Sequence, residues 1–320
     1  MRHPQRIELP TGLPIGTVNV YLFAEPEPIL VDTGVRSKDS QMALEAGLAA
    51  NQLTLADLKR IIISHPHIDH CGLAGLIVAK SQATVHVHET ALPWLIDYRG
   101  QWRQRSAYYR DQLFRQWQLP LEVSQPILDY MEETEAAADS VPSERIIPFR
   151  AHEMLAMGDL DWQILHTPGH ASSLTCFYQP DTRQFLSTDM LLPLTPTPIV
   201  EKPPAGQLKR VPSLPQFLDS LDQIEKLDSD IVYPGHGQPF DNPIDVIQYQ
   251  RARIAQRKEE CLTLIQNGVQ SVADLLLAMY PNYPPRFRFA GLWMVIGYLD
   301  LLKAEDRIEW IDEGDLIRSI

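Results

Sequence analysis

The feature that most constrains the fold of this chain is a histidine-rich segment at residues 64–72, SHPHIDHCG. Within six positions it holds His65, His67, Asp69 and His70. An apolar, β-branched run at residues 60–64 precedes it and a helical pattern at residues 72–80 follows, so we expect a strand-to-helix turn. Imidazole and carboxylate groups at this spacing suit borderline divalent cations and can face two adjacent centres. The segment therefore predicts a metal site at the end of a strand.

Three further ligand-type side chains follow the same pattern, in which an apolar strand and a turn precede an imidazole or a carboxylate. They are His170 in LHTPGH, Asp189 in STDM and His236 in YPGHGQ. Strand ends meet at one edge of a layered α/β fold, so we expect all seven side chains to converge there. Five histidines and two aspartates are enough for two cations: three histidines on one, a mixed set on the other, and a shared carboxylate.

Strand-like runs and helical stretches alternate through the first 240 residues, which indicates a layered α/β domain. Two segments differ from this pattern. Residues 90–143 have few β-branched residues and place Trp94, Tyr98 and Trp102 on one helical face, which predicts a helical insert. Residues 244–320 are predicted to form a mainly helical module that closes with a short hairpin. We therefore expect a catalytic domain at 1–243 and a C-terminal domain at 244–320.

The net charge and the cysteine content indicate which classes of partner are disfavoured and which cellular compartment is expected. The chain carries 28 basic and 41 acidic residues, a formal charge of −13, and its last 77 residues hold nine basic and eleven acidic ones. Such a field repels phosphate backbones, which disfavours DNA as a partner. Three widely spaced cysteines are not typical of a disulfide framework, and the sequence leads us to expect neither a signal peptide nor a membrane span. We expect a cytoplasmic protein with no membrane partner. Its C-terminal module is expected to pack against the catalytic domain, to form a wall of the cleft or to form a homodimer.

The order of these motifs resembles that of the metallo-β-lactamase fold superfamily over residues 15–240. The shared elements are H-x-H-x-D-H, the distant His, Asp and His, and ILVDTG at 29–34. The resemblance implies a four-layered αββα sandwich of the glyoxalase II-like branch, and the tail is similar to winged-helix modules of some superfamily hydrolases. It implies a first metal on His65, His67 and His170, and a second on Asp69, His70 and His236, with Asp189 bridging. Asp32 would accept hydrogen bonds that orient the ligands, the alternative being a plain turn aspartate.

This ligand set implies a hydrolytic mechanism. Two cations about 3.5–4 Å apart bridge a water, lower its pKa and stabilise the oxyanion, so that Asp69 and Asp189 would hold a bridging hydroxide as nucleophile. Zinc is the expected ion, with iron or manganese as alternatives. We predict a metal-dependent hydrolase that cleaves a thioester or another ester of an anionic small molecule. The alternatives are a phosphodiesterase or ribonuclease acting on RNA, and a non-enzymatic metal-binding sensor.

The expected anionic substrate follows from the basic, aromatic character of the insert. Residues 92–118 hold five arginines against two aspartates, together with seven aromatic residues. Such a surface suits an anionic, partly apolar ligand, although a packed helix pair with solvated arginines has the same composition. The candidate substrate-binding residues lie in the insert and in the segment after Asp189. They are Arg103, Arg105, Lys202, Lys209 and Arg210.

Overall fold

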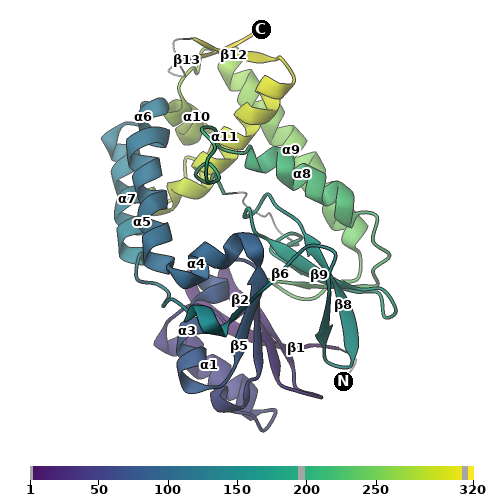
Figure 1. Ribbon diagram of the computed structural model, residues 1–320. Helices are drawn as coiled ribbons and strands as arrows, with labels where there is room; N and C mark the ends of the chain where they lie inside the picture. Colours follow the sequence, from purple (N-terminus) through teal and green to yellow (C-terminus); the bar gives the residue numbers. More distant parts are fainter. Residues whose placement is uncertain (1–2, 194–198, 312–315) are drawn as a thin grey trace.

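Two β-sheets form the centre of this computed structural model, which describes residues 3–193, 199–311 and 316–320 (Figure 1). The first sheet runs in the order β1-β2-β3-β4-β5-β6 and the second in the order β11-β10-β9-β8-β7. The strands of the first are β1 (Gln5–Leu13), β2 (Gly16–Phe23), β3 (Ile29–Val31), β4 (Arg60–Ile63), β5 (Thr84–His88) and β6 (Ile146–Phe149). Those of the second are β7 (Met154–Met157), β8 (Leu160–His166), β9 (Thr175–Gln179), β10 (Gln184–Thr188) and β11 (Ile231–Pro234).

The two sheets pack face to face through a buried apolar layer. In β4 the side chain of Ile62 belongs to this layer, whereas Ile61 and Ile63 belong to the hydrophobic cluster on the other face. Successive side chains of a strand point to opposite faces, so an unbroken apolar strand is buried on both sides. Phe23 of β2 and Trp162 of β8 meet edge to face in this layer, with ring centroids 5.7 Å apart.

Helices cover the outer face of each sheet, which completes the four-layered arrangement expected from the sequence. α1 (Lys38–Ala49) and α3 (Ala74–Lys80) pack on the first sheet, and α8 (Ser213–Ile224) packs on the second. Ser37 begins α1 by accepting a hydrogen bond from the backbone N–H of Ser40 at 3.2 Å. The buried apolar positions of α8 recur every three or four residues, at Leu214, Phe217, Leu221 and Ile224.

The segment at 90–143 is helical, as predicted, and its helices stand beside those of the tail in Figure 1. Its elements are α4 (Leu92–Ile96), α5 (Tyr98–Tyr108), a π-helical turn (Tyr109–Leu113), α6 (Phe114–Gln116) and α7 (Leu121–Thr134). Asp97 caps α5 by accepting a hydrogen bond from the N–H of Gly100 at 3.0 Å. The predicted aromatic face is present, since the rings of Tyr98 and Trp102 stack 6.0 Å apart at 9°.

The tail has the predicted element order of three helices and a hairpin. It consists of α9 (Pro243–Gln266), α10 (Val272–Met279), α11 (Arg288–Ala304), β12 (Ile308–Ile311) and β13 (Leu316–Ser319). Its apolar side chains share one hydrophobic cluster with α8, α7 and the outer face of the second sheet. The division into domains at residue 243 therefore stays a prediction. None of the described helices is long and apolar enough to cross a membrane.

Candidate metal centre

The topology brings the carboxyl ends of several strands to one edge. β3 and β4 run parallel to each other, as do β10 and β11, and β8 is antiparallel to β9, which is antiparallel to β10. Each predicted ligand lies just beyond such an end: the histidine-rich segment after β4, His170 after β8, Asp189 after β10 and His236 after β11. The four segments meet although more than 160 residues separate the first from the last. One sequence expectation changes: a helical turn, α2 (Ile68–Cys71), begins earlier than predicted, so Asp69 and His70 lie on a helix.

Three histidines form the first group of ligand atoms. Nε2 of His65 lies 2.8 Å from Nδ1 of His67, and Nε2 of His170 lies 3.0 Å from the same Nδ1. The three atoms are mutually within 4.8 Å, close enough to hold one ion. Burial lowers the pKa of His65 and of His67 well below the usual range, because it disfavours the charged imidazolium. At neutral pH these rings are uncharged, which is the form that binds a metal.

The second group combines two carboxylates with two imidazoles. Nε2 of His236 lies 3.4 Å from Oδ2 of Asp69, and Nε2 of His70 lies 3.9 Å from that oxygen. Oδ2 of Asp189 connects this group to the first. It lies 3.3 Å from Nε2 of His70, 3.5 Å from Nε2 of His236 and 3.4 Å from Nε2 of His170. One carboxylate oxygen thus faces both groups.

Hydrogen bonds on the outer ring nitrogens fix which atom of each histidine points inward. Nδ1 of His70 bonds to Oδ2 of Asp32 at 2.8 Å, and Nδ1 of His236 bonds to the carbonyl of Thr17 at 2.7 Å. The Nε2 atoms of these two histidines are buried and have no hydrogen-bond partner among the described residues. Buried polar atoms are rarely left unpaired, and the hydrogen bonds at Nδ1 leave each Nε2 lone pair directed at the centre. The donor set therefore fits a cation.

Electrostatics also favour positive charge at this place. Burial opposes the charge of His70, but the carboxylates of Asp189, Asp32 and Asp69 outweigh it and raise its pKa well above the usual value. The same balance, led by Asp189, raises the pKa of His236 to about 10. Burial likewise opposes the charge of Asp189, and the two histidines outweigh it and hold its pKa well below the usual range. A cation would satisfy these carboxylates in place of the protons.

Asp32 lies beneath the centre rather than in a free turn. Its carboxylate accepts hydrogen bonds from the backbone N–H of Ser64 and from Ser64 Oγ, each at 2.8 Å, and bonds to Nδ1 of His70. Its backbone is left-handed, with φ of 61°, an uncommon conformation outside glycine that functional sites often retain. These contacts fit the predicted role of orienting ligands.

Two glycines needed by the site escaped the sequence interpretation, which read them only as turn residues. A Cβ on Gly235 would lie 2.0 Å from Oδ1 of Asp189, so only glycine lets that carboxylate occupy its place. Gly169 has φ of 135°, and a Cβ there would lie 2.4 Å from Cα of Phe217. The turn before His170 thus packs directly on α8. A Pro-Gly pair immediately before a ligand was the available signal.

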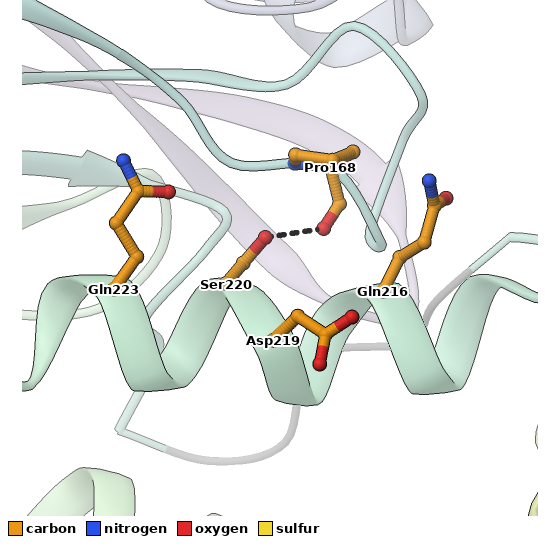
Figure 2. Close-up of a pocket in the computed structure, with 5 residues that line it drawn as sticks. All are labelled: Pro168, Gln216, Asp219, Ser220 and Gln223. Atoms are coloured by element: carbon orange, nitrogen blue, oxygen red, sulfur yellow. Dashed lines mark hydrogen bonds between the residues drawn. The ribbon is translucent and has the colours of Figure 1, made fainter.

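A pocket lies between the turn before His170 and α8, and the proposed metal ligands do not line it. Figure 2 shows Pro168, Gln216, Asp219, Ser220 and Gln223 around a volume of about 230 Å³. Ser220 Oγ donates to the carbonyl of Pro168 at 2.7 Å, which fixes the His170 turn to α8 (Figure 2). The pocket lining contains no metal ligand, so we assign the residues a supporting role.

The five candidate substrate-binding residues fall into two groups according to their surroundings. Nη2 of Arg103 is paired with Glu135 at 2.6 Å, and its side chain is two-thirds exposed. Arg210 forms a two-pronged ion pair with Asp300 of α11, at 2.8 and 2.6 Å. Lys209 is exposed. These three residues are therefore already paired or face solvent.

Arg105 and Lys202 have a different environment. Arg105 is buried, and its Nη2 lies 3.2 Å from Oε1 of Glu201. Lys202 is half-buried, and its Nζ donates to Oε1 of Gln101 at 3.1 Å. Both contacts join α5 to the segment that follows Asp189.

Comparison with known proteins agrees with this geometry. A model of the metallo-beta-lactamase superfamily matches residues 13–236. The Bacillus subtilis (strain 168) protein named "Probable metallo-hydrolase YqjP" is 26% identical over 315 residues, 97% of this chain and 95% of that protein. The crystal structure of a metallo-beta-lactamase family protein from Thermus thermophilus superposes with a TM-score of 0.83 at 26% identity, covering 100% and 99% of the two chains. An "Atrochrysone carboxyl ACP thioesterase" of Aspergillus fumigatus is 25% identical over 130 residues, 37% of this chain and 38% of that protein.

Proposed function

This chain belongs to the metallo-beta-lactamase superfamily and is a metal-dependent hydrolase, and from that premise we propose that it uses two divalent cations to cleave a thioester or another ester of an anionic small molecule. The observation that carries the proposal is the position of Asp189. Its Oδ2 lies within 3.5 Å of a histidine nitrogen of the first group and of two in the second. This position supports the proposal that one carboxylate binds both ions.

The proposed ligands follow the two groups. His65, His67 and His170 hold the first ion, Asp69, His70 and His236 hold the second, and Asp189 binds both. Zinc suits this set of nitrogen and oxygen donors, and iron and manganese suit it as well. When bound, the pair supplies a water of lowered pKa as nucleophile and stabilises the negative charge that develops on the ester carbonyl. Asp32 keeps His70 in the tautomer whose Nε2 faces the ion.

The cysteine beside the ligands does not compete as a nucleophile. Cys71 is buried, and burial raises the pKa of its thiol far above neutrality, so the thiolate is absent at pH 7. The three cysteines of the chain are all free and buried, which supports the cytoplasm as its compartment.

Two further observations support the choice of substrate class. One similar protein is named a thioesterase. A basic insert would also suit RNA, but two of its arginines are engaged in ion pairs, Arg103 with Glu135 and Arg110 with Asp111, which weakens that alternative. The glyoxalase II-like branch and the winged-helix-like character of the tail remain part of this proposal.

A substrate panel with the metal-loaded protein tests the proposed function. We expect hydrolysis of at least one thioester or lactone by zinc- or manganese-loaded protein, and no comparable hydrolysis of phosphodiesters. Phosphodiester cleavage alone would overturn the substrate class. Elemental analysis of the same preparation is expected to give two ions per chain, and one ion or fewer after reconstitution would overturn the dinuclear centre.

A further inference from the structure

Arg105 differs from the other arginines of the insert in its burial. Its side chain is 5% exposed, whereas that of Arg103, two residues earlier on α5, is 67% exposed. Burying an unpaired guanidinium is strongly destabilising, so such a position needs compensating interactions. The guanidinium of Arg105 has one hydrogen bond to the described residues, from Nη2 to Oε1 of Glu201. A guanidinium offers five N–H donors, so one carboxylate contact leaves capacity for a second anion.

Two tryptophans hold the guanidinium in place. Its central carbon lies 4.7 Å from the ring centroid of Trp94 and 5.4 Å from that of Trp102. Cation–π contacts of this kind stabilise a desolvated arginine and orient its plane. The arginine is therefore preorganised, and little side-chain entropy remains to be lost when an anion binds.

The carboxylate partner of Arg105 belongs to a segment that contacts the metal centre. Ile199, two residues before Glu201, contacts the backbone of a proposed ligand, because its N–H donates to the carbonyl of His170 at 3.1 Å. The Arg105–Glu201 pair thus lies beside the segment that contacts the first group of proposed ligands.

The local charge balance favours an anion. Arg105 and Lys202 bring two positive charges to this part of the site, and Glu201 is their carboxylate neighbour. Nζ of Lys202 donates to Oε1 of Gln101 at 3.1 Å, one turn of α5 from Arg105, so the two cations lie close together. A ligand carboxylate or phosphate beside them would relieve this repulsion.

We propose that Arg105 binds the anionic group of the substrate next to the metal centre, and that Glu201 is its resting partner, which the substrate displaces. This inference rests on the proposed function and assigns its substrate specificity to one residue. A purely structural role is the competing explanation, in which the Arg105–Glu201 pair only fixes the segment after Asp189 to α5. If Arg105 binds the substrate anion, Arg105→Gln and Glu201→Gln should change the preference for charged substrates in opposite directions. If the pair is only structural, both substitutions should change it in the same direction or not at all.

The test compares Arg105→Gln with Glu201→Gln on matched thioesters and the metal-loaded full chain. One pair is glutaryl-pantetheine and its terminal amide, and the other is acetyl-phosphopantetheine and acetyl-pantetheine. For each pair the ratio of kcat/KM, charged over neutral, is measured. We expect Arg105→Gln to lower the ratio at least tenfold for one pair, and Glu201→Gln to raise it about threefold, because a competing carboxylate is removed. The pair that responds distinguishes a carboxylate from a phosphate.

Controls separate charge recognition from folding. Arg99→Gln, an exposed arginine of α5, is expected to leave both ratios within twofold of wild type. The double variant Arg105→Gln/Glu201→Gln removes the ion pair as a neutral unit, so it is expected to fold and still to lack the preference. A shift of both single variants in the same direction, or no loss in Arg105→Gln, would overturn the inference.

A binding measurement keeps this inference separate from the proposed activity. Thioether analogues, in which a methylene replaces the reactive carbonyl, cannot be hydrolysed, and their affinity is measured by calorimetry. We expect the charged analogue to bind wild type at least tenfold more tightly than Arg105→Gln, even if no ester in the panel is a substrate. Equal affinities would refute the role of Arg105, whereas absent turnover with preserved discrimination would refute only the proposed activity.

Discussion

The metal centre and the helical region around it are built in different ways. The seven proposed ligands lie at or just after strand ends, and hydrogen bonds to Asp32 and the carbonyl of Thr17 lock the rings of two of them. The surrounding region, made from the insert, the tail and the segment after Asp189, is held by ion pairs and aromatic contacts. Trp293 of α11, for example, donates to the hydroxyl of Tyr109 at 2.8 Å. From this comparison we propose that the sheets position the metal ligands and that the surrounding helices select the substrate.

The largest expected effect comes from removing the shared ligand. Asp189→Ala is predicted to lose one ion and about 1000-fold in turnover, roughly 4 kcal/mol in barrier, because one carboxylate positions both cations. Elemental analysis and steady-state kinetics measure the two losses. Circular dichroism is the control and is expected to show an intact fold, since Asp189 lies beyond β10 and outside the hydrophobic core. Turnover within tenfold of wild type would contradict the assignment.

A large effect on stability without an effect on metal content is expected at the junction with the tail. Asp300→Asn leaves the mostly buried Arg210 without its carboxylate, which is predicted to cost about 3 kcal/mol of unfolding free energy. Chemical denaturation measures this change. The ion content is expected to equal that of wild type, and a loss of metal would show that the two regions are not independent.

An intermediate effect is expected at Gly235, where the backbone itself makes room for a ligand. Gly235→Ala places a methyl group 2.0 Å from Oδ1 of Asp189 and is predicted to destabilise the fold by about 2 kcal/mol while weakening metal binding. Gly206→Ala is the matched control. Its φ is 80° and its Cβ meets nothing within 4 Å, so only backbone strain is added. Equal metal affinity in the two variants would argue against the role of Gly235.

The smallest effect is expected on the exposed side of the insert. Arg103→Gln breaks the ion pair with Glu135, which solvent screens, so the melting temperature is predicted to change by less than about 2 °C. Differential scanning fluorimetry measures it. A larger shift would show that surface ion pairs contribute more to the stability of the helical insert than their exposure suggests.

The sequence predicted the strand ends well because each ligand has a local signal, an apolar run followed by a turn. The strands β1 and β7 have weak sequence signals because their exposed and buried residues alternate and their apolar runs are short. The signal of β6 is weak because proline interrupts its apolar run and its two central residues are exposed.

The environment of the arginines was beyond sequence reasoning. The pairs Arg105–Glu201 and Arg210–Asp300 join residues more than 85 positions apart, and no local pattern indicates which arginine is buried. Composition alone therefore grouped Arg105 with Arg103 and Arg210, although the three have different partners. The fold has to be known before a buried arginine with unused N–H donors can be distinguished from an exposed or fully paired one.

The most direct test of the central claim is an anomalous difference map from crystals of the zinc-loaded protein, recorded on both sides of the zinc absorption edge. The account predicts two peaks, one among His65, His67 and His170 and one among Asp69, His70 and His236, with the carboxylate of Asp189 in contact with both. A single peak, or two peaks of which Asp189 contacts only one, would contradict it.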